Sequence, residues 1–537
     1  MRGKMTLLSS ESISWEFPYP SQRMPILGDN VVATSQPLAA QAGLRMLQKG
    51  GNAVDAAIAA AITLTVVEPT SNGIGSDAFA LVWDGGKLYG LNGSGRSPKA
   101  WSRERFENLT QMPQYGWDAV TVPGAVDLWA TLSKRLGRLP FMDLFEPAVH
   151  YAQNGFPVSP ITGSKWAEAY HTYGHIPEFA RTFFPSGRAP RPGERFRCSF
   201  QARTLETIAR THGEAFYRGS LAEQMIAHSK ASGGSMTLDD LASHRSEWVE
   251  PISQEYRGVH LHEIPPNGQG LAALIALGIL SRFNIREFPV DSAESVHLQI
   301  EAMKIGFAVA HQHVGDPISM KIDVSVLLDK NFLADQARTI SPDRANFPHT
   351  DIFSDYGTVC LATADASGMM VSMIQSNFTG FGSGVVIPDT GISLQNRGFG
   401  FCIQKGHPNC VDGGKRPYHT IIPGFVTCEG NPLLSFGVMG AHMQPQGHVQ
   451  MMVRIFDYGQ NPQTASDAPR WHLCEDLRVA LEADLTHKIG DELRKKGHKI
   501  ISTDPVWGYG GAQLILKLDQ GYCAASDHRK DGQAVGY

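Results

Sequence analysis

The sequence has few charged residues and no large excess of either sign. Charged side chains make up 18% of the 537 residues, and 47 basic against 52 acidic residues leave a net charge of −5. Soluble domains average roughly 25% charged residues, and chains that stay disordered usually carry a high net charge. The composition therefore excludes a highly charged disordered chain. It also excludes a polycationic surface for nucleic acid or anionic lipid.

Long apolar runs and paired cysteines are lacking as well. The longest apolar run, residues 53–67, is interrupted by Asp55 and is too short to span a bilayer. Residues 1–23 contain no apolar stretch of the kind that secretory signals carry. The seven cysteines include no C-x-x-C pair, which disfavours a zinc ribbon or a disulfide framework. We therefore expect a cytoplasmic protein with free, buried thiols and no membrane contact.

Helix and hairpin signals alternate along the chain. Apolar spacing predicts a helix over residues 37–49, ended by two glycines, and Asn52 is placed to cap a second helix over residues 53–67. The segment 101–345 is mostly helical in pattern. Three pairs of β-type runs predict hairpins: 78–83 with 87–91, 358–365 with 370–376, and 513–518 with 521–526. Hairpins at both ends of a helical middle predict an α+β fold with helices packed on antiparallel sheets.

An unusual combination occurs at Tyr356-Gly357-Thr358-Val359, where glycine precedes a β-branched hydroxyl residue at a predicted strand start. A turn followed by a strand is one interpretation, and the four residues alone favour it. Self-cleavage is the other: the Thr358 hydroxyl attacks the Gly357 carbonyl, the peptide becomes an ester, and water releases an N-terminal threonine. Its free α-amine, with a pKa of about 8, would then act as the base.

Two other features are chemically suggestive but have simple structural explanations. The glycine-rich segment 437–447 follows a predicted strand, and successive N–H groups in such a turn can form an oxyanion hole. His260 and His262 alternate along a predicted strand, and His311 and His313 end a helical run. Neither histidine pair has further ligands at recognisable spacing. We expect no metal at either pair.

Together these segments resemble the γ-glutamyltranspeptidase family of N-terminal nucleophile hydrolases. The resemblance covers residues 32–537 and rests on short motifs in the family's order, among them G-G-N-A-V-D-A-A at 50–57 and S-D-H-R-K-D at 526–531. The other motifs lie at residues 40–44, 67–69, 73–75, 122–124, 315–317, 382–386 and 415–417.

The resemblance implies a single domain over residues 1–537, folded as a four-layer αββα sandwich of α+β class. It implies a proenzyme that cuts itself between Gly357 and Thr358. The products would be a large chain, 1–357, and a small chain, 358–537, which stay associated. It also allows two such heterodimers to pair.

The same resemblance assigns the catalytic groups. Thr358 would be the nucleophile, and the second hydroxyl that hydrogen-bonds it falls on Ser376, where the family usually has threonine. The oxyanion pair, usually two glycines, falls on Gly440 and Ala441. Alanine keeps its N–H donor if the backbone conformation there tolerates a side chain. No metal or organic cofactor is required.

Substrate recognition departs further from the transpeptidase pattern. Transpeptidases hold the glutamyl α-carboxylate with an arginine and two serines, and the α-ammonium with an aspartate and polar partners. Losing that aspartate disfavours a free α-amino acid head group, because an unpaired buried ammonium is costly. The aligned positions here carry Ser94 for the arginine, Gly400 for the aspartate, Phe378 for an asparagine, and His419 and Thr420 for the serines.

This pattern is similar to the amidohydrolase and acylase branch of the family, which includes oxamate amidohydrolase and glutaryl-cephalosporin acylase-like proteins. Candidate holders of a substrate carboxylate are Arg96, Arg397, Arg416 and His419, because arginine's planar fork pairs with carboxylates. A structural ion pair is the alternative for each. The segment 401–415 is shorter than the lid-bearing loop of typical transpeptidases, which predicts a more open site.

The sequence thus predicts an enzyme that hydrolyses an amide of a small carboxylate-bearing substrate through an ester on Thr358. One alternative is a true γ-glutamyl hydrolase or transferase. The other is a non-catalytic relative that uses the scaffold for binding or assembly, and the presence of Thr358, Ser376 and the glycine-rich turn argues against it.

Overall fold

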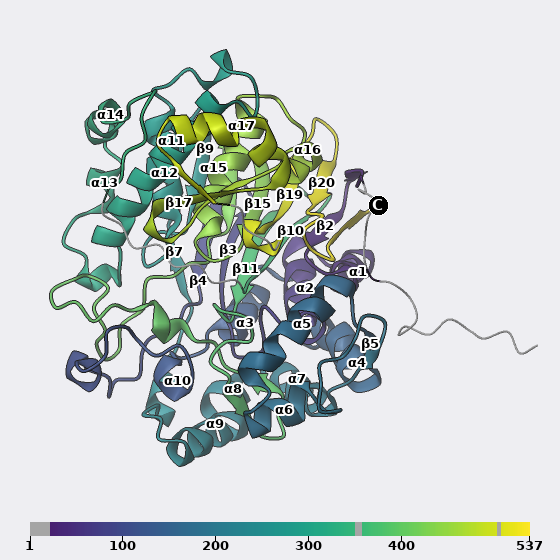
Figure 1. The fold of residues 1–537 in the computed structure, drawn as a ribbon. Coiled ribbons are helices and arrows are strands. Elements are labelled where there is room, and N and C mark those ends of the chain that lie inside the picture. Colours follow the sequence, from purple (N-terminus) through teal and green to yellow (C-terminus); the bar gives the residue numbers. More distant parts are fainter. Residues whose placement is uncertain (1–14, 16–21, 349–356, 502–505) are drawn as a thin grey trace, which may run out of the picture.

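The computed structural model describes residue 15 and residues 22–348, 357–501 and 506–537. Tyr356 and most of the segment 1–23 lie outside the described residues. Two seven-stranded sheets form the centre of the molecule, and every strand pairing within them is antiparallel. Helices lie on both sides of this pair of sheets (Figure 1).

The first sheet draws its strands from the middle and the end of the chain. In spatial order they are β1 (Ile26–Gly28), β20 (Tyr522–Ser526), β19 (Gly511–Lys517), β15 (Asn431–Met439), β14 (Gly424–Cys428), β9 (Val259–Glu263) and β8 (Ile252–Tyr256).

The second sheet combines strands from both sides of the Gly357–Thr358 junction. In spatial order they are β21 (Gln533–Gly536), β2 (Val31–Thr34), β10 (Val359–Ala364), β11 (Met370–Ser376), β3 (Asp77–Asp84), β4 (Lys87–Asn92) and β7 (Glu247–Val249). The three hairpins that the sequence predicts are therefore present as β3–β4, β10–β11 and β19–β20.

Alternation along β10 shows how the layers are built. Cys360 and Ala362 belong to the apolar cluster between the two sheets, whereas Val359 and Leu361 pack toward the helices on the outer face. Successive residues of a strand point to opposite faces, so a strand that is apolar throughout is buried on both sides. The result is the four-layer αββα sandwich of the N-terminal nucleophile hydrolases, which confirms the predicted fold class.

The outer helical layers follow the chain order. The layer on the second sheet comes from the first half of the chain: α1 (Pro37–Gln48), α2 (Ala53–Val67), α3 (Ala125–Leu136), α4 (Glu146–Asn154), α5 (Pro160–Tyr173), α6 (Pro177–Phe183), α7 (Ser199–Thr211), α8 (Glu214–Arg218), α9 (Ser220–Ala231) and α10 (Leu238–Ser243). The layer on the first sheet contains α11 (Gly270–Leu280), α12 (Ala293–His313), α13 (Val324–Leu327), α14 (Lys330–Arg338), α15 (Met443–Phe456), α16 (Pro462–Asp467) and α17 (Ala483–Lys495).

The central helix α2 has the bounds and the cap that the sequence predicts. The side chain of Asn52 accepts the N–H of Asp55, and the Asp55 carboxylate accepts the N–H of Asn52, each at 3.0 Å. This capping box satisfies two of the donors that a helix start leaves unpaired. All fifteen residues of α2 are buried, so the cap fixes a helix that is surrounded by protein.

Two sequence predictions need correction. The segment 101–345 is mostly helical, and β9 lies at the strand predicted around His260 and His262, but the segment also supplies two unpredicted strands, β7 and β8, to the main sheets. It supplies as well the two-stranded pair β5 (Phe156–Pro157) and β6 (Arg195–Phe196). The strand predicted before the glycine-rich segment is longer than expected, because β15 continues to Met439. Small sheets elsewhere are β12 (Val386–Ile387) with β13 (Ile392–Ser393), and β16 (Trp471–Leu473) with β17 (Arg478–Leu481) and β18 (Lys499–Ile501).

The cysteines form no disulfide bonds. All seven thiols are free, four of them buried, and Cys402, Cys410 and Cys428 are half-buried. Within the described ranges, no helix combines the length and the apolar character needed to cross a membrane.

Candidate active site

Thr358 and Ser376 meet at one end of the β10–β11 hairpin. The hairpin register pairs Val359 with Gln375, so the residues just outside this pair, Thr358 and Ser376, face each other. Oγ1 of Thr358 lies 3.2 Å from Oγ of Ser376 and 2.6 Å from the carbonyl oxygen of Gly357. The Ser376 hydroxyl donates to that same carbonyl oxygen at 2.6 Å and accepts the N–H of Phe378 at 2.8 Å. Both hydroxyls are buried.

The junction needs a residue without a side chain at position 357. A Cβ on Gly357 would lie 2.3 Å from the backbone nitrogen of Gly380, a separation that real Cβ atoms do not show. The turn that approaches so closely is itself strained, since Phe378 has a φ of 79°. Non-glycine residues in this left-handed region cost of order 1–3 kcal/mol and cluster at functional sites. The packing therefore holds an unusual backbone directly against the Gly357–Thr358 bond.

The turn after β15 approaches the same end of the hairpin. The hydroxyl of Ser372 donates to the carbonyl of Phe436 at 2.7 Å, and a Cβ on Gly437 would lie 2.6 Å from Sγ of Cys360. Cys360 lies two residues from Thr358 along β10, whereas Ser372 pairs with Ala362, which is two residues further away. β15 therefore runs toward Thr358 as it approaches Gly440. The structure therefore directs the predicted oxyanion turn toward the predicted nucleophile.

Gly440 and Ala441 both have positive φ. Their values are 118° and 50°, so Ala441 holds a side chain in the left-handed region. Its carbonyl accepts hydrogen bonds from Nε2 of Gln269 at 2.9 Å and from the N–H of Gln444 at 3.2 Å. These hydrogen bonds offset the energetic cost of the left-handed conformation at Ala441. They use its carbonyl, so its N–H takes no part in them.

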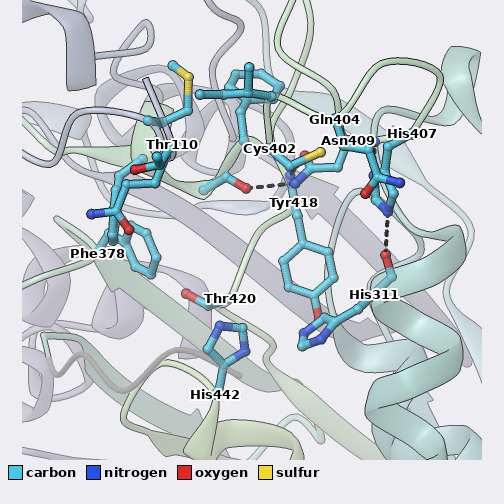
Figure 2. A pocket seen from close by; sticks show the side chains of 16 residues that line it. Thr110, His311, Phe378, Cys402, Gln404, His407, Asn409, Tyr418, Thr420 and His442 are labelled. Carbon is cyan, nitrogen blue, oxygen red and sulfur yellow. Dashed lines mark hydrogen bonds between the residues drawn. The ribbon is translucent and has the colours of Figure 1, made fainter. Parts of the chain in front are cut away.

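A pocket of about 300 Å³ lies beside this turn. Figure 2 shows Thr420 and His442 at its base, Phe378 on one wall, and Tyr418 and His311 on the other. Residues 110–112 and the segment after η6 (Arg397–Gly400) form the remaining walls, and a hydrogen bond from Asn409 to the carbonyl of Gly400 at 2.7 Å holds the latter.

Arg397 lies behind the pocket wall, fully buried. Its Nη1 donates to Oγ1 of Thr420 at 2.7 Å, and its guanidinium lies 4.7 Å from the centre of the Phe378 ring. Nε and Nη2 have no hydrogen-bond partner among the described residues. Burial lowers the pKa of Arg397 to about 9, and the neighbouring Asp77 opposes that shift. Burial likewise raises the pKa of Asp77 to about 7.

His419 and Ser94 lie in the buried polar network around Asp77. Nε2 of His419 lies 3.2 Å from the Asp77 carboxylate, and burial lowers the pKa of His419 well below its usual value. The hydroxyl of Ser94 donates to Asn92 at 2.7 Å and accepts from Asn267 at 3.2 Å. Neither side chain is among the described residues that line the pocket.

Arg96 and Arg416 are engaged in ion pairs away from the pocket. Arg96 lies 2.9 Å from Asp316, and Arg416 makes a two-pronged contact with Glu247 at 2.8 and 2.9 Å. Both arginines border a separate cavity of about 80 Å³. Of the predicted substrate-binding residues, the structure thus brings Phe378, Thr420 and, one step behind them, Arg397 together. The other predicted residues, Ser94, Arg96, Arg416 and His419, lie outside the lining of the pocket.

Gln269 is a central residue that the sequence analysis did not single out. It is fully buried before α11, and its Nε2 donates to the carbonyls of Thr420 and Ala441 at 2.5 and 2.9 Å. Its Oε1 lies 3.0 Å from Nδ1 of His442. One amide therefore connects the pocket base with the oxyanion turn. A polar residue in the P-P-N-G-Q-G segment at 265–270 was the available signal.

Members of both histidine pairs contact other side chains of the protein. His262 contacts the Thr427 hydroxyl at 2.8 Å on neighbouring strands, and His311 packs on Phe307 and Tyr418. Among the described residues, one group has metal-ligand geometry, and it is a different one: His297, Glu301 and His498. There the ammonium of Lys304 lies 2.7 Å from the Glu301 carboxylate, so Glu301 already has a cationic partner within the protein.

Two stacked antiparallel sheets between helical layers place this chain in the N-terminal nucleophile hydrolase class of folds. Comparison with known proteins gives a more specific assignment within that class. The family model of γ-glutamyltranspeptidase matches residues 39–537. A cephalosporin acylase from Bacillus halodurans superposes with a TM-score of 0.94 at 46% identity, covering 98% of this chain and 99% of that one.

Curated proteins agree with the structural likeness. The glutathione hydrolase-like YwrD proenzyme of Bacillus subtilis is 38% identical, over 94% of this chain and 98% of its own length. The oxamate amidohydrolase proenzyme of Klebsiella pneumoniae is 34% identical, over 93% of this chain and 97% of its own. The chain belongs to the γ-glutamyltranspeptidase family and is an amide-bond hydrolase of that family.

Proposed function

We propose that the chain is a proenzyme that cuts itself between Gly357 and Thr358. The observation that carries this proposal is the 2.6 Å contact of Thr358 Oγ1 with the Gly357 carbonyl oxygen, to which Ser376 also donates. Attack of Oγ1 on the carbonyl carbon forms an ester, and the C–N bond breaks as the Thr358 amine takes up a proton. Water then hydrolyses the ester to the Gly357 carboxylate and the free Thr358 hydroxyl.

The mature enzyme would use the same hydroxyl on an external amide. The α-amine of Thr358 accepts the hydroxyl proton as Oγ1 attacks the substrate carbonyl, and the N–H groups of Gly440 and Ala441 bind the developing oxyanion. The proton passes to the leaving amine, and water releases the acyl group from the ester. Ser376 orients the nucleophile. No step in this scheme calls for a metal or an organic cofactor.

The two products, 1–357 and 358–537, would remain one domain. The sheet order supports this, because β10 of the small chain pairs with β2 of the large chain, and β11 pairs with β3. Separating the chains would open both ladders and the apolar cluster between the sheets. The relatives named above as proenzymes agree with such processing.

For the substrate, the sequence predicts a carboxylate, and Arg397 is the candidate that the geometry supports best. Two of its nitrogens, Nε and Nη2, have no hydrogen-bond partner among the described residues, and it lies one side chain from the pocket. The γ-glutamyl alternative requires a counter-charge for an ammonium. The described residues that line the pocket include no aspartate or glutamate, which disfavours that alternative.

Replacing the nucleophile tests the proposal. Thr358→Ala should stay a single chain on denaturing electrophoresis and should hydrolyse no amide, whereas Thr358→Ser should still be cut, more slowly. A γ-glutamyl anilide, oxamate and a glutaryl amide assayed side by side then separate the substrate alternatives. Faster release from the γ-glutamyl anilide, accelerated by a dipeptide acceptor, would favour a transferase.

A further inference from the structure

Asp77 is a buried acid close to the site that the proposed mechanism does not use. It begins β3, and the sheet register pairs it with Ser376, the residue that contacts Thr358. Its side chain is fully buried. Oδ1 accepts the N–H of Gly124 at 3.0 Å, and Oδ2 lies 3.2 Å from Nε2 of His419. A carboxylate in such a place needs compensation, because burying a charge is costly unless it is paired and hydrogen-bonded.

The charged and titratable side chains that interact with Asp77 come from η6, from the segment before β14 and from α8: Arg397, Arg416, His419 and Tyr217. Burial lowers the pKa of His419 and raises that of Tyr217, so both are neutral near pH 7. Arg416 is paired with Glu247. Arg397 makes no ion-pair contact with any described acid, and Asp77 is the acid whose charge supports its guanidinium. The charge left to balance Asp77 is therefore that of Arg397.

Thr420 connects Arg397 to the pocket. Nη1 of Arg397 donates to Oγ1 of Thr420 at 2.7 Å, and Thr420 lines the cavity (Figure 2). A hydroxyl that accepts one hydrogen bond can still donate its own proton, so Thr420 can donate to a carboxylate in the pocket. The described lining contains no lysine or arginine. Arg397, one hydroxyl away, thus supplies the positive charge, which acts over several ångströms because the region is buried.

We propose that Asp77 is the internal counter-ion of Arg397 and thereby sets the affinity of the pocket for a carboxylate. The inference rests on the proposed function, which assigns the substrate carboxylate to Arg397. Two carboxylates would then share one guanidinium, and a nearby like charge disfavours the ionised form of an acid. Asp77 therefore takes up a proton when the substrate carboxylate binds and releases it when the product leaves. It acts through Arg397 and touches no substrate.

The expected pH dependence follows from these charges. Burial raises the pKa of Asp77 to about 7, and Arg397 opposes that rise. A bound carboxylate offsets the charge of Arg397, so the pKa of Asp77 rises further and a proton is taken up. Below pH 7 Asp77 is mostly protonated and leaves Arg397 available. Above pH 7 the ionised Asp77 competes with the ligand, and binding weakens.

Proton uptake can be counted directly on the unaltered protein with glutarate, a dicarboxylate that stays ionised between pH 6 and 8. Isothermal titration calorimetry at pH 7.5, in two buffers that differ in ionisation enthalpy, should show net proton uptake on binding. Kd should rise by about five- to ten-fold from pH 6 to pH 8. Binding without proton uptake, at a Kd that does not change with pH, would overturn the inference.

A matched pair of variants assigns the proton to Asp77. Asp77→Asn keeps an oxygen for the Gly124 N–H but cannot ionise. It should bind glutarate at pH 8 about as tightly as the unaltered protein does at pH 6, with no proton uptake. Asp84→Asn, at the other end of β3, should keep the pH dependence of the unaltered protein. Full pH dependence in Asp77→Asn, or weaker binding by the same factor at every pH, would overturn the inference.

Failure of the proposed function gives a different result. No glutarate binding at any pH by a protein that is cut after Gly357 would refute the carboxylate site and the role of Asp77, and would leave the Thr358 mechanism intact. A chain that is neither cut nor active on any amide would instead refute the proposed function itself.

Discussion

At the scale of single residues, the Gly357–Thr358 junction depends on close backbone packing. Gly357→Ala places a Cβ 2.3 Å from the Gly380 nitrogen, so the junction must shift away from the attacking hydroxyl. We expect cleavage to slow by at least about ten-fold, as small misplacements of reacting groups commonly do. The cut fraction over time on denaturing gels measures this. Gly490→Ala is the control, because a Cβ there meets only ordinary contacts at 3.5 Å, and it should be cut like the unaltered chain.

Gln269 gives a second residue-scale prediction. Gln269→Leu removes the hydrogen bonds to the carbonyls of Thr420 and Ala441 and thereby loosens the left-handed turn at Ala441. Loss of an oxyanion donor lowers kcat by about 10²–10³. A misaligned donor should therefore lower kcat by about ten- to hundred-fold and change KM less. Steady-state kinetics with the substrate that the unaltered enzyme cleaves fastest measure this loss of kcat. The exposed Gln41→Leu should be indistinguishable from the unaltered enzyme.

Residues differ in how far the sequence could place them. Thr358 and Ser376 were assigned from the family resemblance, and the hairpin register explains why they meet, because both lie at one end of β10–β11. Gln269 contacts Ala441, 172 residues away, and only the tertiary fold decides that contact. The same holds for Arg96 and Arg416: the residue type suggests an anion site, but their partners, Asp316 and Glu247, come from distant segments.

At the scale of elements, α2 depends on its capping box. Asn52→Ala removes the acceptor for the Asp55 N–H and the donor to the Leu136 carbonyl. A lost N-cap costs typically about 1 kcal/mol, and up to about 2, and this helix is fully buried. We expect the midpoint of denaturant unfolding to fall, while the exposed Asn331→Ala in α14 should leave it unchanged. An unaltered midpoint in Asn52→Ala would contradict the role of the cap.

Element prediction succeeded where local pattern and burial agree. Helix α2 and the three hairpins combine clear periodicity with strong turn or cap signals, and their predicted positions agree with the structure within a few residues. β7 and β8 were missed because they lie in a mostly helical stretch, where pairing with β4 and β9 decides their conformation. The strand predicted before the glycine-rich segment ended ahead of Gly437. In the structure β15 continues through Gly437, which lies directly against the side chain of Cys360.

At the scale of the whole molecule, buried neutral histidines make stability depend on pH. Burial lowers the pKa of His472 to about 4, as it does for His311, whereas an unfolded histidine titrates near about 6.5. Between these values the unfolded chain binds protons that the folded chain does not. The stability from these histidines is therefore complete above about pH 6.5 and is lost as the pH falls toward 4. Asp77, whose pKa is raised to about 7, acts in the opposite direction.

Comparing variants isolates the histidine contribution. We expect His472→Gln to reduce the fall in Tm between pH 7.5 and pH 5, measured by scanning calorimetry. The exposed His171→Gln should show the same fall as the unaltered chain. A pH dependence in His472→Gln as steep as that of the unaltered chain would refute the contribution of this histidine.

The order of strands in the second sheet also explains why cutting one peptide bond need not divide the protein. The strands β2 and β3 before the junction flank β10 and β11 after it within one continuous sheet. We expect the two chains to co-elute on size-exclusion chromatography in native buffer and to separate only in denaturant. Elution as two separate species in native buffer would contradict this interleaved arrangement.

The most direct test of the central claim is the N-terminal sequence of the small chain, read together with the intact masses of both chains. We expect a new N-terminus beginning Thr358-Val359-Cys360, with products of about 39 and about 20 kDa from the 58.5 kDa chain. We also expect Thr358→Ala to give a single mass, that of the uncut chain. A catalytically active protein that remains one chain, or a new N-terminus at another residue, would contradict Thr358 as the nucleophile.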